Sequence, residues 1–189
     1  EVTVARYRWC VESGGCTEPG KGSFCNWGRE GRDDHPVNCV DWQQATQFCE
    51  WAGQRLPREA EWEKAARGES GAKYPWGDVE FGVATKKWAN IADETAKREL
   101  PRFVPFAAEG YDDAFATTAP VGSFPDGASP YGALDMAGNV AECVWDKTID
   151  GRGLRGGSWF NLPLDTRASG RIALLPRGRN DLLGFRCAQ

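Results

Sequence analysis

The chain has 189 residues, 41% of them hydrophobic and nine of them tryptophan, so one domain with a substantial core is the simplest expectation. Its net charge is −4, with both signs mixed and no basic tract, which argues against a nucleic-acid partner. No apolar run is long enough to span a membrane and no signal peptide is seen. The first residues read as the interior of a domain, so we expect an N-terminal segment upstream that could carry a targeting signal.

The seven cysteines indicate disulfides rather than zinc. No two of them form a CxxC pair, and the single histidine, His35, cannot complete a Cys/His cluster. Disulfides favour an extracytoplasmic or cell-surface location, with the cytoplasm of a thermophile as the alternative. Because seven is odd, one cysteine stays unpaired, and the apolar neighbours of Cys143 favour this one.

Two helices are predicted in the first third of the chain. Residues 1–40 are rich in Gly, Cys and turn-forming residues and are expected to form an irregular loop held by disulfides. Asp41, with Gln44 three residues later, is typical of a capping box, and Gly53 ends the helix that follows. A second helix is predicted from about residue 58 to residue 67.

Regular periodicity then disappears until about residue 132. So long a segment without regular structure is rare inside a compact domain, and something other than hydrogen-bond ladders should hold it. Short strands are predicted at residues 140–145, 153–159 and 184–188.

Two motifs that suggest chemistry do not support it. Residues 151–156 spell GxGxxG but lead into a predicted strand, whereas a dinucleotide site needs a strand, a turn and a helix. No serine lies in a nucleophile elbow, and His35 lies in an acidic loop, so no ordinary nucleophile–base pair is present. The sequence offers no catalytic residue, and His35 is expected to hydrogen-bond within its loop.

Oxygen-bearing residues gather in two places. Residues 135–142 place Asp135 and Glu142 around a glycine turn, and residues 90–91 and 113–115 offer a second mixture of side-chain and carbonyl oxygens. Calcium prefers such mixed oxygen ligands and would order a long loop. Asp and Asn in loops also form Asx-turns, which is the alternative explanation.

Seven segments resemble, in order, the formylglycine-generating-enzyme family, also called the sulfatase-modifying factor family. They are HPVNCVDW (35–42), QRLPREAEWE (54–63), YPWG (74–77), TAPVGSF (118–124), DMAGNV (135–140), RGGS (155–158) and LGFRC (183–187). The sequence departs from the family at Arg58, where a capping Thr is usual, and at residues 141–143, which read Ala-Glu-Cys instead of Trp-Glu-Trp.

The resemblance implies one irregular α+β domain over residues 1–189, related to the C-type lectin fold, with two helices, short antiparallel strands and little regular structure. It also implies two structural calcium sites. The first would use the side chains of Asn90 and Asp113 with the carbonyls of Ile91 and Phe115. The second would use the side chains of Asp135 and Glu142 with the carbonyls of Gly138 and Val140.

The resemblance further implies a disulfide between Cys49 and Cys187. For the remaining cysteines we expect Cys10 to pair with Cys16 and Cys25 with Cys39.

The copper ligands of the family's enzymes are missing. Those enzymes oxidise a substrate cysteine with copper held by two cysteines shortly after the Gly-Gly-Ser motif. Here Asn161 and Thr166 occupy or neighbour those places, and no cysteine occurs between Cys143 and Cys187. Soft Cu(I) requires thiolates, so no copper is expected. Related sulfoxide synthases need a histidine-bound iron, which one histidine cannot build, and the sequence therefore predicts a protein that is not an enzyme.

Residues 155–188 alternate between two kinds of position. Short runs without helical or strand pattern, here called the insert positions, are separated by the remaining residues, here called the framework positions. The insert positions are Phe160, Asn161, Leu162, Leu164, Asp165, Gly170, Ile172, Ala173, Leu174, Leu175, Gly178, Asn180, Asp181 and Leu182.

This alternation resembles the variable proteins of diversity-generating retroelements, which use the same lectin-like fold. In those systems an AAC codon of a template scatters to codons ending in C, which encode every residue except Trp, Met, Lys, Glu and Gln. All the insert positions obey this restriction. Residues 155–188 are therefore predicted to be a variable region.

The alternative is that residues 172–175 form a buried strand. Arg171, Pro176, Arg177 and Arg179 are expected to interrupt such a strand, because proline is poorly tolerated in central strands. If exposed, the apolar insert positions would form an interaction patch.

The sequence thus predicts a non-catalytic scaffold, braced by disulfides and calcium, that binds an unknown protein or cell-surface ligand through this patch. Phe160, Ile172 and the leucines would be apolar anchors, and Asn161, Asp165, Asn180 and Asp181 polar selectors. The alternatives are a formylglycine-generating-enzyme-like oxidoreductase and a regulatory lectin-like module without variability.

Overall fold

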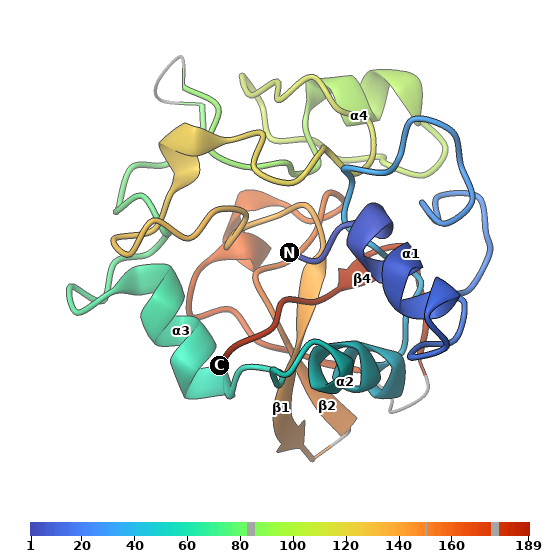
Figure 1. The fold of residues 1–189 in the computed structure, drawn as a ribbon. Coiled ribbons are helices and arrows are strands. Elements are labelled where there is room, and N and C mark those ends of the chain that lie inside the picture. Colours follow the sequence, from blue (N-terminus) through green and yellow to red (C-terminus); the bar gives the residue numbers. More distant parts are fainter. Residues whose placement is uncertain (83–85, 150, 175–177) are drawn as a thin grey trace.

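The computed structural model describes residues 1–189 except 83–85, 150 and 175–177, and for Leu174 only the backbone (Figure 1). Short helices and strands are joined by long loops, as the prediction of little regular structure requires. Some of these loops are buried, such as residues 88–93 and 135–140. In chain order the elements are α1 (Val4–Glu12), α2 (Trp42–Trp51), α3 (Glu59–Arg67), α4 (Glu94–Glu99), the 3₁₀ turn η1 (Pro125–Gly127), β1 (Ala141–Thr148), β2 (Gly151–Arg155), the 3₁₀ turn η2 (Pro163–Thr166), β3 (Ile172–Leu174) and β4 (Leu183–Gly184).

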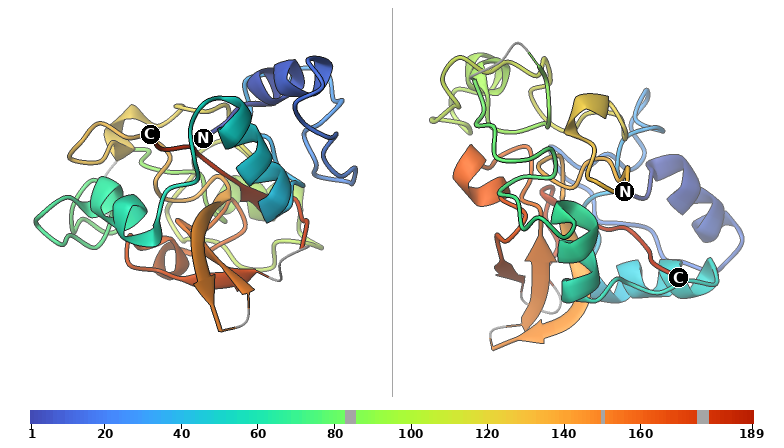
Figure 2. Two further views of the ribbon diagram at one scale, coloured as in Figure 1. Left: turned by 60° about the horizontal axis from the view of Figure 1, so that its bottom comes forward. Right: turned by 90° about the vertical axis from the view of Figure 1, so that its left-hand side faces the viewer.

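The four strands form one sheet in the order β3-β2-β1-β4. The β1–β2 and β2–β3 pairs are antiparallel, whereas β4 runs parallel to β1. The β1–β2 and β2–β3 pairs are the short antiparallel strands that were predicted, and the parallel β1–β4 pair was not foreseen. Figure 2 shows α3 on one side of the β1–β2 hairpin and α2 on the other.

Both predicted helices are confirmed. At the start of α2 the Asp41 carboxylate accepts from the Gln44 N–H at 2.8 Å, and the Gln44 side chain accepts from the Asp41 N–H at 3.2 Å, which completes the capping box. At the start of α3 the Arg58 N–H donates to Glu61 at 2.8 Å. Gly68 follows α3 with φ 63°, a left-handed conformation that favours glycine.

The prediction of a wholly irregular N-terminal loop was wrong. Residues Val4–Glu12 form α1, whose Thr3 side chain caps Arg6 and whose buried residues Val4, Tyr7 and Cys10 recur every third position. The long aperiodic segment likewise contains α4, capped by Asp93. Both helices are short, so their periodic signal is weak against the surrounding turn formers.

Two predicted strands are shorter than expected. The strand predicted at residues 153–159 ends at Arg155, because Gly156 and Gly157 turn the chain with φ values of 85° and 71°. At the C-terminus only Leu183–Gly184 forms a strand, and Ala188 makes an isolated bridge with Arg55.

The largest core cluster joins α1, α2, β1 and β4 around Tyr7, Phe48 and Phe185. All three expected disulfides, Cys10–Cys16, Cys25–Cys39 and Cys49–Cys187, are confirmed. Cys143 is unpaired and fully buried, as expected. Among the described helices, none is long and apolar enough to cross a membrane.

Candidate functional site

Many framework positions of the C-terminal segment are buried, although Ser169, Arg171 and Arg179 are exposed. Trp159, Thr166, Ala168, Leu183 and Phe185 are all buried, with at most 2% of each residue exposed. They attach the segment to the clusters beneath it; Trp159 packs with Ala92, Ala96 and Val104. Framework side chains therefore fix the course of the chain.

The insert positions face outward. Leu164 is 62% exposed, Ile172 41% and Phe160 40%, and every other described insert position is exposed or half-buried. Leu175 and the side chain of Leu174 lie outside the described residues, as do Pro176 and Arg177. None of the described insert positions is buried, whereas the buried residues of the segment are all framework positions.

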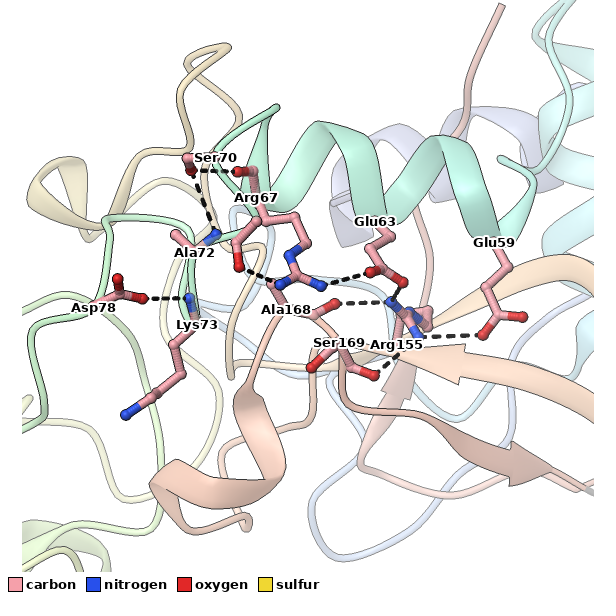
Figure 3. A network of polar contacts seen from close by, with 11 residues as sticks. Glu59, Glu63, Arg67, Ser70, Ala72, Lys73, Asp78, Arg155, Ala168 and Ser169 are labelled. Carbon is pink, nitrogen blue, oxygen red and sulfur yellow. Dashed lines mark hydrogen bonds and ion pairs between the residues drawn. The ribbon is translucent and has the colours of Figure 1, made fainter.

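Framework arginines hold the segment by ion pairs. Figure 3 shows Arg155, whose side chain is 2% exposed, donating to Glu59 at 3.2 Å and to Glu63 at 2.7 Å, both on α3. The same guanidinium donates to the carbonyl of Ala168 at 2.8 Å and to that of Ser169 at 3.4 Å. One buried cation therefore fastens the segment between Asp165 and Gly170 to α3.

Two further framework arginines extend this attachment. Arg171 forms an ion pair with Glu59, and Arg179 donates twice to Asp41 Oδ2, at 2.6 and 2.8 Å. Each of them lies beside insert positions, so the neighbouring backbone is held without using an insert side chain.

The insert positions attach to the scaffold mainly through main-chain atoms. Their carbonyl oxygens accept hydrogen bonds from scaffold groups: Asn161 from the Ala92 N–H at 3.0 Å, Asn180 from the Cys39 N–H at 3.0 Å, Asp181 from Asn38 Nδ2 at 2.8 Å and Leu182 from the Ala141 N–H at 2.8 Å. A main-chain bond does not depend on the side chain beyond Cβ. These contacts therefore permit exchange of the residue.

Some insert positions make side-chain contacts that restrict which residues they can accept. The Asn161 side chain accepts from the Ser158 N–H and hydroxyl at 2.9 and 2.8 Å, and Leu162 and Leu182 partly pack against the cluster around Trp159. A Cβ atom on Gly170 would lie 2.9 Å from the Arg167 carbonyl, so a side chain there requires a small backbone shift.

The stretch that begins at Ile172 does form a strand. The expectation that the flanking Arg and Pro residues interrupt any strand was wrong, because β3 pairs with β2 over Ile172–Leu174. It is an edge strand, where proline and charged neighbours are tolerated. Ile172 and Ala173 are nevertheless exposed, so the buried strand considered as the alternative is not what forms.

The first predicted calcium set is brought together. Asn90 and Asp113 are buried, and the Asp113 carboxylate accepts from the N–H groups of Ile91 and Phe115 at 2.9 and 2.8 Å. Burial, with the nearby charge of Asp93 adding to it, raises the pKa of Asp113 to about 8. Asn90 Oδ1 is buried and has no hydrogen-bond partner among the described residues.

A buried carboxylate with a raised pKa and a buried amide oxygen without a hydrogen-bond partner are both groups that a hard cation would satisfy. These residues fit calcium, and the ion would supply the positive charge that this buried site otherwise lacks. Asp93, which sequence reasoning missed, belongs to the same surroundings, because its carboxylate accepts from the Asp113 N–H at 2.6 Å.

The second predicted set is occupied differently. Both oxygens of the buried Glu142 carboxylate bond to Arg186 at 2.6 Å, and Trp62 Nε1 donates to Glu142 at 2.5 Å. Asp135 accepts from the Gly122 N–H at 2.7 Å. Arg186 thus pairs with Glu142, while burial raises the pKa of the neighbouring Asp135. Calcium at this second set stays a prediction. Among the described residues no three Asp, Glu, His or Cys side chains converge as a metal cluster.

The cysteines offer no thiolate pair. Six of the seven are in disulfides, and burial raises the pKa of Cys143, the remaining one, to about 12. Asn161 and Thr166 stand where the resemblance places copper ligands, and neither side chain is a soft ligand.

His35 hydrogen-bonds within its loop, near Thr118 Oγ1 at 3.0 Å and Arg32 Nη1 at 3.0 Å. Burial, followed by the charge of Arg32, lowers the pKa of His35 to about 4. At neutral pH this histidine is therefore uncharged, and its hydrogen-bond partners lie in loops outside residues 155–188.

Two solved structures share the fold. The Treponema denticola variable protein 1 matches with a TM-score of 0.69 and 23% identity, over 98% of this chain and 80% of the other. PvdO from Pseudomonas aeruginosa matches with a TM-score of 0.69 and 23% identity, over 94% of this chain and 73% of the other. The predicted C-type-lectin-like, formylglycine-generating-enzyme-like α+β fold is confirmed.

Curated relatives are more similar in sequence. The inactive C-alpha-formylglycine-generating enzyme 2 of Bos taurus is 35% identical over 169 residues, which cover 82% of this chain and 50% of the relative. The formylglycine-generating enzyme of Streptomyces coelicolor is 37% identical over 181 residues, which cover 84% and 54%. The chain spans about half the length of these relatives. The model of the sulfatase-modifying factor enzyme 1-like domain matches residues 1–189, and the chain belongs to this family.

Proposed function

We propose that this domain is a non-catalytic ligand-binding protein, the variable protein of a diversity-generating retroelement, and that its insert positions form a hypervariable binding surface. The observation that carries the proposal is the difference in burial between the two kinds of position in residues 155–188. Framework side chains such as Trp159 and Arg155 are buried, whereas every described insert position is exposed or half-buried. A site diversified by mutation needs this arrangement, because a varied residue must not disturb the core.

The composition of the surface suits binding. Phe160, Leu164 and Ile172 are exposed apolar side chains, and such residues mark an interaction site where they form one contiguous patch. The polar insert positions, such as Asp165 and Asn180, would select among ligands by hydrogen bonds. A structural neighbour that bears the name variable protein adds support.

Catalysis of the family's oxidative kind is disfavoured by the donor set. Copper would need two thiolates, and the single unpaired cysteine is buried with a raised pKa. Relatives named inactive show that non-catalytic members occur in this family.

Structural calcium at Asn90 and Asp113 belongs to the same proposal. The ion would brace the loop that supports the insert positions, because Ala92, next to Ile91, is bonded to Asn161. The three disulfides indicate an oxidising environment, and we place the domain outside the cytoplasm or at the cell surface.

The DNA downstream of the coding sequence tests the proposal. We expect a near-copy of the segment for residues 155–188, with AAC codons at the insert positions, beside a gene for a reverse transcriptase. Sequencing of a cell population should find substitutions confined to the insert positions. If no such copy exists and the population is uniform, the domain is a lectin-like module without variability. If the domain binds copper and oxidises a cysteine peptide, it is a formylglycine-generating-enzyme-like oxidoreductase.

A further inference from the structure

A pocket lies where the insert positions meet residues outside the segment 155–188. It has a volume of about 180 Å³. One wall consists of insert positions and the other of scaffold residues; the lining is Phe160, Asn161, Leu162 and Asp165 on the first and Ala92, Val104, Pro105 and Phe106 on the second. The pocket is therefore composite, with only half of its lining open to diversification.

The scaffold wall is preformed. After α4, the Leu100 carbonyl accepts from the Phe103 and Val104 N–H groups at 2.9 and 2.8 Å, which makes a tight turn, and Pro105 restricts the backbone that follows. Val104 is buried, so it anchors this turn in the core. Phe106, two residues on, is 69% exposed at the pocket.

The two walls are joined by a bond that mutation does not remove. The Ala92 N–H donates to the Asn161 carbonyl at 3.0 Å, and the Ala92 carbonyl accepts from the Ala108 N–H at 2.8 Å. Both are main-chain interactions, so the distance between the backbones of the two walls does not require a particular side chain at residue 161. Different insert sequences would therefore share the same scaffold wall at the same position.

The chemistry of the lining selects an apolar occupant. The scaffold wall presents only carbon side chains, and Phe160 and Leu162 add more carbon opposite. The Asn161 amide oxygen is already engaged by Ser158, and Asp165 is the charged lining residue. A sugar would need several unengaged polar partners in such a cavity, whereas an aromatic or leucine-like side chain needs none.

We propose that Val104, Pro105 and Phe106 form a constant hydrophobic clamp, and that the ligands are polypeptides that insert one aromatic or large aliphatic side chain between this clamp and Phe160. The clamp supplies affinity common to all variants, and the insert positions around it supply specificity. This inference rests on the proposed function, since it assumes that the insert positions contact the ligand.

The test selects ligands from a random linear dodecapeptide library displayed on phage, with the whole 189-residue domain immobilised. We expect enriched peptides to share an aromatic or large aliphatic residue whose replacement by alanine weakens binding at least tenfold by calorimetry. Phe106→Ala should weaken every enriched peptide at least tenfold. Tyr131→Ala is the matched control, because Tyr131 is a 57% exposed aromatic residue outside the pocket, and it should change binding less than twofold.

A second selection separates the clamp from the variable wall. The double variant Phe160→Ser/Asp165→Tyr uses residues that the codon restriction permits, and it should enrich different peptides that still lose binding on Phe106→Ala. Because Phe106 is exposed, Phe106→Ala should melt within about 2 °C of the parent, which excludes unfolding as the cause.

The outcomes distinguish the two levels of the proposal. If Leu164→Ser and Ile172→Ser abolish binding while Phe106→Ala leaves it unchanged, the variable surface stands and the clamp is wrong. If none of these changes matters, or if no peptide with an apolar anchor is enriched, both are wrong for polypeptide ligands. If the domain binds glycans, and this binding is lost in the Phe160→Ser variant alone, the assignment of a polypeptide partner is wrong.

Discussion

Arg155 on β2 and Glu63 on α3 form an ion pair of 2.7 Å in which the arginine side chain is 2% exposed. The two residues are 92 positions apart in the chain, and their ion pair attaches the C-terminal segment to α3. The guanidinium also satisfies two carbonyls of the segment, so it holds backbone as well as charge.

Arg155→Ala should therefore destabilise the domain strongly. The change leaves Glu59 and Glu63 without their shared cation and two carbonyls without their donor, and we expect a loss of about 3 kcal/mol in the free energy of unfolding. Urea denaturation measures it. Arg55→Ala is the control: its ion pair with Glu61 is solvent-exposed and should contribute far less. Equal losses would mean that Arg155 is not an anchor.

Substitutions at insert positions should change the stability of the domain less than substitutions at buried framework positions. Leu164→Ser changes an exposed residue and should alter stability by less than about 0.5 kcal/mol. Trp159→Ala, five residues earlier, removes a buried indole and should cost about 3–5 kcal/mol. Thermal denaturation of both variants makes the comparison, and a large loss at Leu164 would count against a variable surface.

The three disulfides should differ in their contribution. Cys49–Cys187 spans 138 residues, whereas Cys10–Cys16 spans 6. In the chain-entropy model the first stabilises the folded state by about 5 kcal/mol and the second by about 2 kcal/mol. Pairwise replacement by alanine, followed by urea denaturation without reductant, measures both. If removing Cys10–Cys16 costs as much as removing Cys49–Cys187, loop closure is not the main source of their effect.

Calcium should stabilise the domain through Asn90 and Asp113. At a calcium concentration about one hundred times the dissociation constant we expect about 2.7 kcal/mol, which corresponds to a rise of about 5–10 °C in melting temperature. Asn90→Ala should abolish the rise, because it removes the unpartnered amide oxygen. Asp135→Asn is the matched control and should keep it. A melting temperature that does not respond to chelation would remove calcium from the proposal.

His35 should make stability fall as the pH is lowered. Its pKa is about 4 in the folded domain and about 6.5 when unfolded, so the unfolded chain binds a proton first as the pH falls. The stabilisation is complete above pH 6.5 and is lost between about pH 6.5 and pH 4. His35→Gln should flatten the dependence of the free energy of unfolding on pH in this window relative to the parent. If the free energy of unfolding depends on pH in the same way in His35→Gln and in the parent, carboxylates alone cause the dependence.

The sequence by itself determined the features encoded in adjacent residues. The capping box of Asp41 and Gln44, the glycine ends of both early helices and the alternation of framework and insert positions are all local patterns. The Cys49–Cys187 pair followed from a family resemblance, which transfers distant pairing that spacing alone leaves open, and the other two pairs were expected among the cysteines that remained. The sequence missed α1, which is followed directly by turn formers and cysteines, and α4, which has only six residues.

The tertiary structure decided the rest, because it depends on which distant groups meet. From the sequence Glu142 is a possible calcium ligand, and only packing shows that Arg186, 44 residues away, pairs with its carboxylate. Phe106 shows no motif, yet the bond between Ala92 and Asn161 brings its loop beside Phe160 to form the pocket. Above all, framework and insert residues alternate at short range along the chain. Only folding, which buries Arg155 and Trp159, turns that alternation into an attached inner face and an exposed outer one.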